Sequence, residues 1–357
     1  MKILTVVGAR PQFIKAATIS RVIESMSDVE EIIVHTGQHF DKNMSDVFFE
    51  EMKIPRPDYN LAIASLSHGA MTGRMLEAIE TVILDERPDW ILVYGDTNST
   101  LAGALAASKL RVKVAHVEAG LRSFDMNMPE EQNRILTDRI SNVLFCPTQL
   151  ALRNLHREGY RDFPVDIHVI GDVMYDAALF YGEKAVRPKD LPVNLESGGF
   201  VLATVHRAEN TDDDKRLSEI VNGLNRLNNK LPVILPLHPR TAKKIQALKL
   251  KLNVSVIAPV GYLGMVYLLQ NCRFVVSDSG GVQKEAYFFE KQCLVLRDET
   301  EWQELVEHGT NIIVGANATK LIEGVNSLNK DHDYSVPFYG NGQSANKIID
   351  KLRILTI

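Results

Sequence analysis

Residues 275–286 read VVSDSGGVQKEA, a stretch that has the order of a strand, a turn and a helix. An apolar run ends in a serine and an aspartate, two glycines follow, and the next residues can open a helix. Exposed backbone N–H groups at a glycine-lined helix start bind phosphate, and the helix dipole favours the negative charge. We therefore expect a nucleotide phosphate at Ser279, Gly280 and Gly281. Glu285, one turn further, is placed to accept hydrogen bonds from a ribose.

The same alternation of short apolar runs and longer helical stretches extends over the whole chain. The predicted strands are 2–7, 31–36, 90–94, 113–117 and 142–146, then 200–205, 233–237, 254–257, 274–276 and 293–296. Predicted helices include 11–26, 71–86, 101–109, 129–140, 214–228, 264–270 and 343–354. Continuous apolar strands are typical of parallel sheets covered by helices on both faces. The fold class is therefore α/β, with two Rossmann-like doubly wound domains and a ligand cleft between them.

The domain boundary is expected where glycine, proline and charge cluster, between residues 171 and 199. We predict an N-terminal domain over 1–170 and a C-terminal, nucleotide-binding domain over 171–342. The last segment, 343–357, is expected to form a helix that packs back on the N-terminal domain.

The bulk composition excludes several classes of protein. The chain has 357 residues, 45% hydrophobic and 24% charged, with a net charge of −5. Such a chain has no basic field for nucleic acid or anionic lipid, and no apolar run is long enough to span a membrane. Three widely spaced cysteines in apolar surroundings, Cys146, Cys272 and Cys293, predict buried thiols in a reducing cytoplasm. Neither a GxGxxG nor a Walker A motif occurs, which disfavours hydride transfer and ordinary NTP hydrolysis.

Polar clusters follow most of the predicted strands, where a parallel sheet binds its ligands. Asp96 follows one strand and Glu118 the next, and neighbouring strands lie about 5 Å apart. Together with Glu130 and Glu131 they form a group of carboxylates, which raise one another's pKa values and can supply an acid and a base. His206 follows the first strand of the second domain and can donate a proton or bind phosphate. No HxxxH, CxxC or dense aspartate pair points to a metal.

Two cations lie at the first strand–helix junction. Arg10 precedes a proline that favours a helix start, and Lys15 follows about one turn later. We expect both to bind a diphosphate.

In this order the motifs resemble the non-hydrolysing UDP-N-acetylglucosamine 2-epimerases. The resemblance rests on GARPQFIK (8–15), TGQH (36–39), GDTNST (95–100), HVEAGLRS (116–123), PEEQNR (129–134), HRAEN (206–210), SDSGGVQKEA (277–286), RDETEW (297–302) and YGNGQSA (339–345). It implies the glycosyltransferase-B arrangement of two domains, elimination of UDP to a 2-acetamidoglucal, and re-addition of UDP with C2 inverted. It also implies a homodimer and no cofactor.

The resemblance assigns roles by position. It implies UDP binding by Arg10, Ser279, Gly280, Gly281 and Glu285, and catalysis by Lys15, Asp96, Glu118, Glu130 and His206. Further candidates for contact with the sugar are Gln38, Glu131, Arg134, Arg207 and Lys284.

Several departures from the common family pattern indicate a branch. Gln12 stands where glutamate is common, Trp302 where arginine is common, and Lys284 where a second glutamate is common. The set resembles the enzymes that act on UDP-2,3-diacetamido-2,3-dideoxy-glucuronate and yield a manno-configured sugar for bacterial surface polysaccharide such as O-antigen. A C6 carboxylate needs a cation, for which Lys284 and Arg207 are candidates.

Other interpretations stay open at this stage. UDP-N-acetylglucosamine is the alternative substrate. A glycosyltransferase of the same architecture would use the same donor site but would need an acceptor groove. A hydrolysing relative would release UDP and free sugar, and a non-catalytic nucleotide-sugar sensor would not need the carboxylates.

Overall fold

The computed structural model describes residues 1–38, 55–192 and 195–356, and of Arg10 it describes the backbone but not the side chain. The chain forms two compact units. Unit 1 comprises Met1–Ala177 and Pro337–Ile357, and unit 2 comprises Ala178–Val336. The chain thus leaves unit 1 after residue 177 and returns to it at residue 337. The boundaries predicted from the sequence lie after residue 170 and after residue 342.

Unit 1 is built on a seven-stranded parallel sheet in the order β3-β2-β1-β4-β5-β6-β7. Its strands are β1 (Lys2–Val7), β2 (Glu30–His35), β3 (Tyr59–Asn60), β4 (Trp90–Tyr94), β5 (Lys113–Val117), β6 (Val143–Cys146) and β7 (Asp166–Val169). The order reverses direction between β1 and β4, the point at which doubly wound sheets bind ligands. The predicted α/β class is confirmed for this unit.

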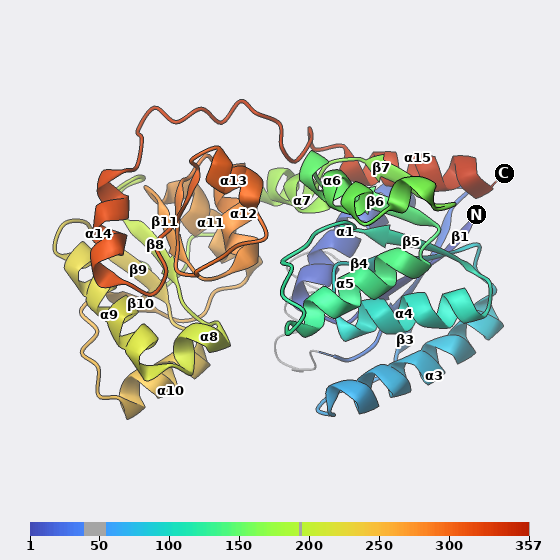
Figure 1. The fold of residues 1–357 in the computed structure, drawn as a ribbon, viewed down its shortest axis with the longest axis horizontal. Helices are drawn as coiled ribbons and strands as arrows, with labels where there is room; N and C mark the ends of the chain where they lie inside the picture. The colour runs from blue at the N-terminus through green and yellow to red at the C-terminus, as the bar shows by residue number, and fades with distance from the viewer. Residues whose placement is uncertain (39–54, 193–194, 357) are drawn as a thin grey trace. The chain divides into compact units, whose positions relative to one another are not determined.

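The helices of unit 1 cover both faces of its sheet (Figure 1). They are α1 (Arg10–Glu24), α3 (His68–Glu86), α4 (Asn98–Lys109), α5 (Pro129–Ile140), α6 (Gln149–Arg157), α7 (Val173–Gly182), which runs on into unit 2, and α15 (Ser344–Thr356), with a short 3₁₀ turn at Tyr160–Asp162. Helix α4 packs between α3 and α5, and α15 packs against α1. The indole of Trp90 donates to Thr356 Oγ1 at 2.7 Å, which ties the last helix to the start of β4.

Unit 2 repeats the architecture with a six-stranded parallel sheet in the order β10-β9-β8-β11-β12-β13. The strands are β8 (Val201–Thr204), β9 (Val233–Pro236), β10 (Ser255–Ile257), β11 (Val275–Ser277), β12 (Cys293–Val295) and β13 (Asn311–Ile313). The helices are α8 (Ala208–Thr211), α9 (Asp214–Asn228), α10 (Pro239–Ala247), α11 (Tyr262–Asn271), α12 (Gly280–Phe288), α13 (Gln303–Glu307) and α14 (Ala318–Asn326). The predicted second doubly wound domain is therefore present.

Successive strand residues of unit 2 pack into different hydrophobic clusters. Val201 and Ala203 of β8 contribute to one cluster, whereas Leu202 between them contributes to the other. The side chains of a strand alternate between the two faces of its sheet, so both faces are apolar and both need helices. This is the reason that the central strands read as continuous apolar runs.

Three strands were not predicted, and all three lie at sheet edges: β3, β7 and β13. Strand β7 reads DIHV and its four residues are exposed or half-buried, so it lacks the continuous apolar run that marks a central strand. Helix α4 begins three residues before the predicted start, because the Thr97 side chain accepts a hydrogen bond from the Thr100 N–H and caps it.

All three cysteines are free thiols buried in the two units, as the sequence predicted. Burial raises the pKa of each thiol, to about 12 for Cys272. Within the described ranges, no helix is both long and apolar enough to cross a membrane.

Glu31 on β2 has a desolvated carboxylate, and replacing it tests how this group affects the stability of the fold. Its Oε1 accepts a hydrogen bond from Thr5 Oγ1 at 2.6 Å, and desolvation raises the pKa of Glu31 above its ordinary value. A raised pKa means that the folded state holds the proton more tightly than the unfolded state, so stability falls as pH rises above about 4.5.

We therefore expect Glu31→Gln to raise the melting temperature at pH 7 by roughly 1–3 °C. The gain should shrink as pH falls towards 4.5, the ordinary value for this group. Thermal unfolding at both pH values measures it. Glu30→Gln, at an exposed position on the same strand, is the matched control and should show no comparable gain. An equal effect of Glu31→Gln at both pH values would contradict the prediction.

Candidate active site

The carboxyl ends of β4 and β5 bring two acidic residues together. The strands pair in parallel with Tyr94 opposite Val117, and the Gly95 N–H donates to Val117 O at 3.0 Å. Asp96 and Glu118 therefore follow their strands at the same edge of the sheet. This is the edge on which a doubly wound fold binds its ligand.

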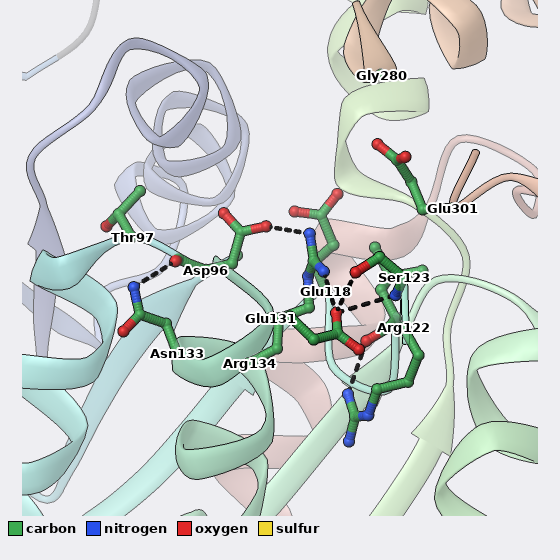
Figure 2. Close-up of polar contacts among 12 residues, drawn as sticks. Asp96, Thr97, Glu118, Arg122, Ser123, Glu131, Asn133, Arg134, Gly280 and Glu301 are labelled. Atoms are coloured by element: carbon green, nitrogen blue, oxygen red, sulfur yellow. Dashed lines mark hydrogen bonds and ion pairs between the residues drawn. The ribbon is translucent and has the colours of Figure 1, made fainter. Parts of the chain in front are cut away.

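Asp96 is held by a cation from α5. Arg134 Nη2 lies 2.6 Å from Asp96 Oδ2, and Arg134 Nη1 lies 2.5 Å from Glu131 Oε2 (Figure 2). Glu131 is fully buried and also accepts the backbone N–H groups of Ser123 and Phe124 at 2.9 and 3.0 Å. Glu131 thus orders the loop after β5, and its own contact with a substrate stays a prediction.

Glu118 forms an ion pair with Lys15 of α1, and both side chains are largely buried. Its backbone has a φ of 74°, a conformation that costs energy for a residue with a side chain and that is found at functional sites. Gly95, beside the pair, leaves the room that it needs. A Cβ atom there would lie 3.2 Å from Glu118 Oε2 and 3.5 Å from Lys15 Nζ.

The sequence predicts that the carboxylates repel one another, and the structure differs from this prediction. Asp96 and Glu118 each have a cation of their own, so the mutual repulsion that grouped carboxylates suggest is offset. Glu130 lies in the first turn of α5 and is exposed.

A buried charged network lies beneath this edge of the sheet. His116 Nδ1 is 2.7 Å from Asp138 Oδ1, and its Nε2 is 2.7 Å from Gly95 O, so both ring nitrogens face acceptors. Asp138 Oδ2 also pairs with Arg122 Nη1 at 2.8 Å and accepts the Gly120 N–H at 3.1 Å. The network thus fixes the backbone one residue before Asp96 and two residues after Glu118.

Two glutamines join the turns that surround the carboxylates. Gln12 Oε1 accepts the Gly8 and Ala9 N–H groups at 2.8 and 2.9 Å, and its Nε2 donates to Tyr94 O at 2.8 Å. Gln38 Oε1 accepts from Ser99 Oγ at 2.7 Å. Arg10 is the first residue of α1, but its side chain lies outside the described part of the chain, and so does the last residue of the TGQH motif.

Residues 279–281, where the sequence predicts a bound nucleotide phosphate, are called the nucleotide turn below. They have the predicted strand–turn–helix form. Ser279 caps α12, accepting from the Val282 N–H at 3.4 Å, and Gly280 and Gly281 form the first turn of the helix. Asp278, which precedes them, is fully buried and accepts the N–H groups of His206 and Arg207 at about 3.0 Å. Asp278 therefore joins the loop after β8 to the nucleotide turn.

The other candidates of unit 2 differ in exposure. The His206 side chain is 42% exposed, with Nδ1 3.6 Å from Asp278 Oδ1. Arg207 is half-buried, and its Nη2 lies 3.8 Å from the position of a Cβ atom at Gly280. Glu285 and Lys284 are buried in α12, Lys284 with 2% exposure and its ammonium over the ring of Trp302. Of the two cations expected for a substrate carboxylate, Arg207 is the more accessible.

Four residues that organise the site were missed: His116, Arg122, Asp138 and Asp278. A histidine in the interior of an apolar strand, as in KVAHV, is a signal that could have found the first. Across residues 1–38, 55–192 and 195–356, no group of three or more His, Cys, Asp or Glu side chains is arranged to hold a metal ion.

Known proteins match this chain over its whole length. The family described as UDP-N-acetylglucosamine 2-epimerase matches residues 21–353. A Pseudomonas aeruginosa protein named UDP-2,3-diacetamido-2,3-dideoxy-D-glucuronate 2-epimerase is 57% identical and aligns over 99% of both chains. The crystal structure of Methanocaldococcus jannaschii UDP-GlcNAc 2-epimerase in complex with UDP-GlcNAc and UDP has a TM-score of 0.88 at 46% identity, covering 100% of this chain and 99% of that one. The Neisseria meningitidis UDP-GlcNAc 2-epimerase bound to UDP-GlcNAc has a TM-score of 0.89 at 32% identity, covering 99% and 100%.

Proposed function

Because the chain belongs to the UDP-N-acetylglucosamine 2-epimerase family, we propose that it inverts C2 of UDP-2,3-diacetamido-2,3-dideoxy-glucuronate to give the manno epimer. One observation carries the choice of sugar: the 57% identity over 99% of both chains to the Pseudomonas enzyme of that name. The exchanges at 12, 284 and 302 agree with that choice. UDP-N-acetylglucosamine is the second candidate, because the 46% identical solved relative binds it.

In this proposal the nucleotide binds mainly at the turn before α12, and the sugar mainly at the carboxylates that follow β4 and β5. The Ser279, Gly280 and Gly281 turn offers N–H groups at a helix N-terminus to the diphosphate. Glu285 accepts from the ribose, and Arg10 adds a positive charge to the phosphates. Asp96, Glu118, Glu130, Lys15 and His206 act on the sugar and on the leaving diphosphate.

The chemistry requires these residue types. The C2 hydrogen is not next to a carbonyl group, so no enolate makes it acidic. Cleavage of the C1–O bond builds positive charge at C1, and the C2–H electrons then form the C1–C2 double bond while a carboxylate takes the proton. UDP leaves with the electrons of the C1–O bond. Cations and backbone donors that stabilise the diphosphate and a base at C2 are therefore the groups that lower the barrier.

Inversion follows when the steps reverse with the proton delivered to the other face of C2. Two carboxylates from neighbouring strands, each with its own cation, can serve as the acid and the base. The glycal and UDP must both be held until UDP adds again, since escape of the glycal would end the cycle and addition of water at C1 would give hydrolysis. The overall reaction is neither an oxidation nor a reduction, and no redox cofactor is needed.

A deuterium-exchange experiment tests the proposal. The protein is incubated in D₂O with each of the two UDP-sugars, and C2 is followed by NMR. We expect deuterium at C2 with UDP still attached, together with the manno epimer, and faster turnover of the diacetamido-uronate. If neither sugar exchanges its C2 proton, the epimerase proposal fails. Faster turnover of UDP-N-acetylglucosamine would overturn the choice of substrate, and accumulation of free UDP and sugar would indicate hydrolysis.

We also propose a cellular location and an oligomeric state for the protein. The free, buried thiols are typical of a reducing compartment, which supports a cytoplasmic enzyme that supplies sugar for a surface polysaccharide such as O-antigen. By its family we also propose a homodimer, which light scattering on the purified protein can measure.

A further inference from the structure

Three consecutive residues of unit 2, Thr300–Trp302, lie along the first turn of α12. The Thr300 Oγ1 donates to Gln283 Oε1 at 2.6 Å. Trp302 Nε1 donates to Gly280 O at 2.8 Å, and the Trp302 N–H donates to Thr300 Oγ1 at 3.3 Å. We call these three residues the brace. The brace thus contacts the helix whose N-terminus forms the nucleotide turn.

The middle residue of the brace lies against the glycine of the turn. A Cβ atom at Gly280 would lie 2.1 Å from Glu301 Oε1, so a larger residue there would displace the carboxylate. Arg297 Nη1 binds Glu301 Oε2 at 2.7 Å. Burial would raise the pKa of Glu301, but the charges of Arg297 and Arg207 outweigh it and lower the pKa. Glu301 is therefore an ionised, paired group fixed beside the turn.

Trp302 is the most constrained member of the brace. Its side chain is 3% exposed, and its indole N–H, which can only donate, meets the carbonyl of the first residue of α12. The Lys284 ammonium lies 4.6 Å from the ring centroid, a cation–π distance. Lys284 and Trp302 stand where glutamate and arginine are common in the family pattern, so the two exchanges meet in one contact.

We propose that Trp302 is a positioning residue. It holds the peptide group between Gly280 and Gly281, and with it the N–H groups of the nucleotide turn, in the orientation that binds the diphosphate. The hydrogen bond to Gly280 O fixes one end of the turn, and the packing of Lys284 on the ring fixes the side chain that makes it. This inference rests on the proposed nucleotide site and concerns a residue that acts through the backbone of the turn.

The decisive variant is Trp302→Phe, which keeps an aromatic ring and removes the indole N–H. We expect the dissociation constant for UDP and the KM for the UDP-sugar to rise about three- to tenfold, the effect of losing one ordinary hydrogen bond. The kcat should fall by the same factor or less, because these N–H groups also stabilise the departing diphosphate. UDP binding is measured by calorimetry and turnover by NMR.

The chain supplies a matched control, because Trp90 is its only other tryptophan. Trp90 is 1% exposed and its indole also makes one buried hydrogen bond, to Thr356 in unit 1. Trp90→Phe should lower the melting temperature by an amount similar to Trp302→Phe and leave UDP binding and KM unchanged. A purely structural tryptophan at 302 would behave in the same way as Trp90.

Fluorescence gives a second readout. In Trp90→Phe the only indole is Trp302, and its emission should change on addition of UDP with the dissociation constant measured by calorimetry. In Trp302→Phe the emission of Trp90 should not change. If Trp302→Phe proves too unstable, Thr300→Val removes the neighbouring brace contact to Gln283 and should raise KM about two- to fivefold.

The possible failures are distinguishable. UDP binding and KM equal in wild type and Trp302→Phe would overturn the inference alone, and so would a Trp90→Phe variant that weakens UDP binding equally. A wild-type protein that binds no UDP would overturn the proposed function and this inference with it.

Discussion

Asp96→Asn is expected to reduce formation of the C2 epimer by about a thousandfold or more while UDP binding stays within about twofold. General acid–base groups contribute about 10²–10⁴ to a rate, and net inversion needs proton removal on one face of C2 and delivery on the other. An asparagine has the shape of aspartate, and its side-chain oxygen can still accept from Arg134, which retains its pair with Glu131. The loss should therefore fall on the chemistry and not on the fold.

Glu118→Gln should have the same effect on turnover. It differs in stability, because Lys15 is left as a buried cation without its partner. NMR measurement of epimer formation and of deuterium at C2, together with calorimetry for UDP, tests both variants. Glu77→Gln, an exposed carboxylate on α3, is the control and should keep wild-type rates. Loss of UDP binding in Asp96→Asn, with exchange preserved at saturating substrate, would refute the assigned role.

The central strands could be predicted from the sequence because each must be apolar on both faces. β1, β4 and β5 were predicted with their observed ends for this reason. An edge strand pairs on one side only and is partly exposed, and β7 accordingly carries no such run. Acidic residues that follow apolar strands are equally visible, and for that reason Asp96 and Glu118 were placed at one edge of the sheet.

The groups that hold the site could not be found in this way. His116 and Asp138 are 22 residues apart, one in a strand and one on a helix whose other residues are mostly polar. The sequence around one residue does not show that the other is its partner, because their pairing depends on how α5 packs on β5. Likewise, Lys284 was predicted as a substrate contact because a reversed charge is conspicuous in sequence, while its packing on Trp302 became visible only with the fold.

Asp138→Asn is expected to lower the free energy of unfolding by about 3–5 kcal/mol at pH 7, the usual effect of breaking a buried ion pair. The Asp138 carboxylate is fully buried and serves three partners: His116, Arg122 and the Gly120 N–H. Arg122 keeps its second partner, Glu158. Removing the negative charge still leaves Arg122 Nη1 and one ring nitrogen of His116 facing a buried amide.

The pH dependence gives this prediction its sharpest test. Burial would raise the pKa of Asp138, but the hydrogen bond from His116 and the charge of Arg122 outweigh it and hold the pKa below its ordinary value of 3.8. The folded state then binds this proton less tightly than the unfolded state. The stabilisation is present above about pH 4 and is lost as pH falls through the folded pKa. Denaturant unfolding from pH 7 to pH 3 should show the gap between wild type and Asp138→Asn closing at the acidic end. Asp166→Asn, at an exposed position on β7, should show no gap at any pH. A gap of constant size would mean that packing, and not the charge of Asp138, holds the backbone behind Asp96 and Glu118.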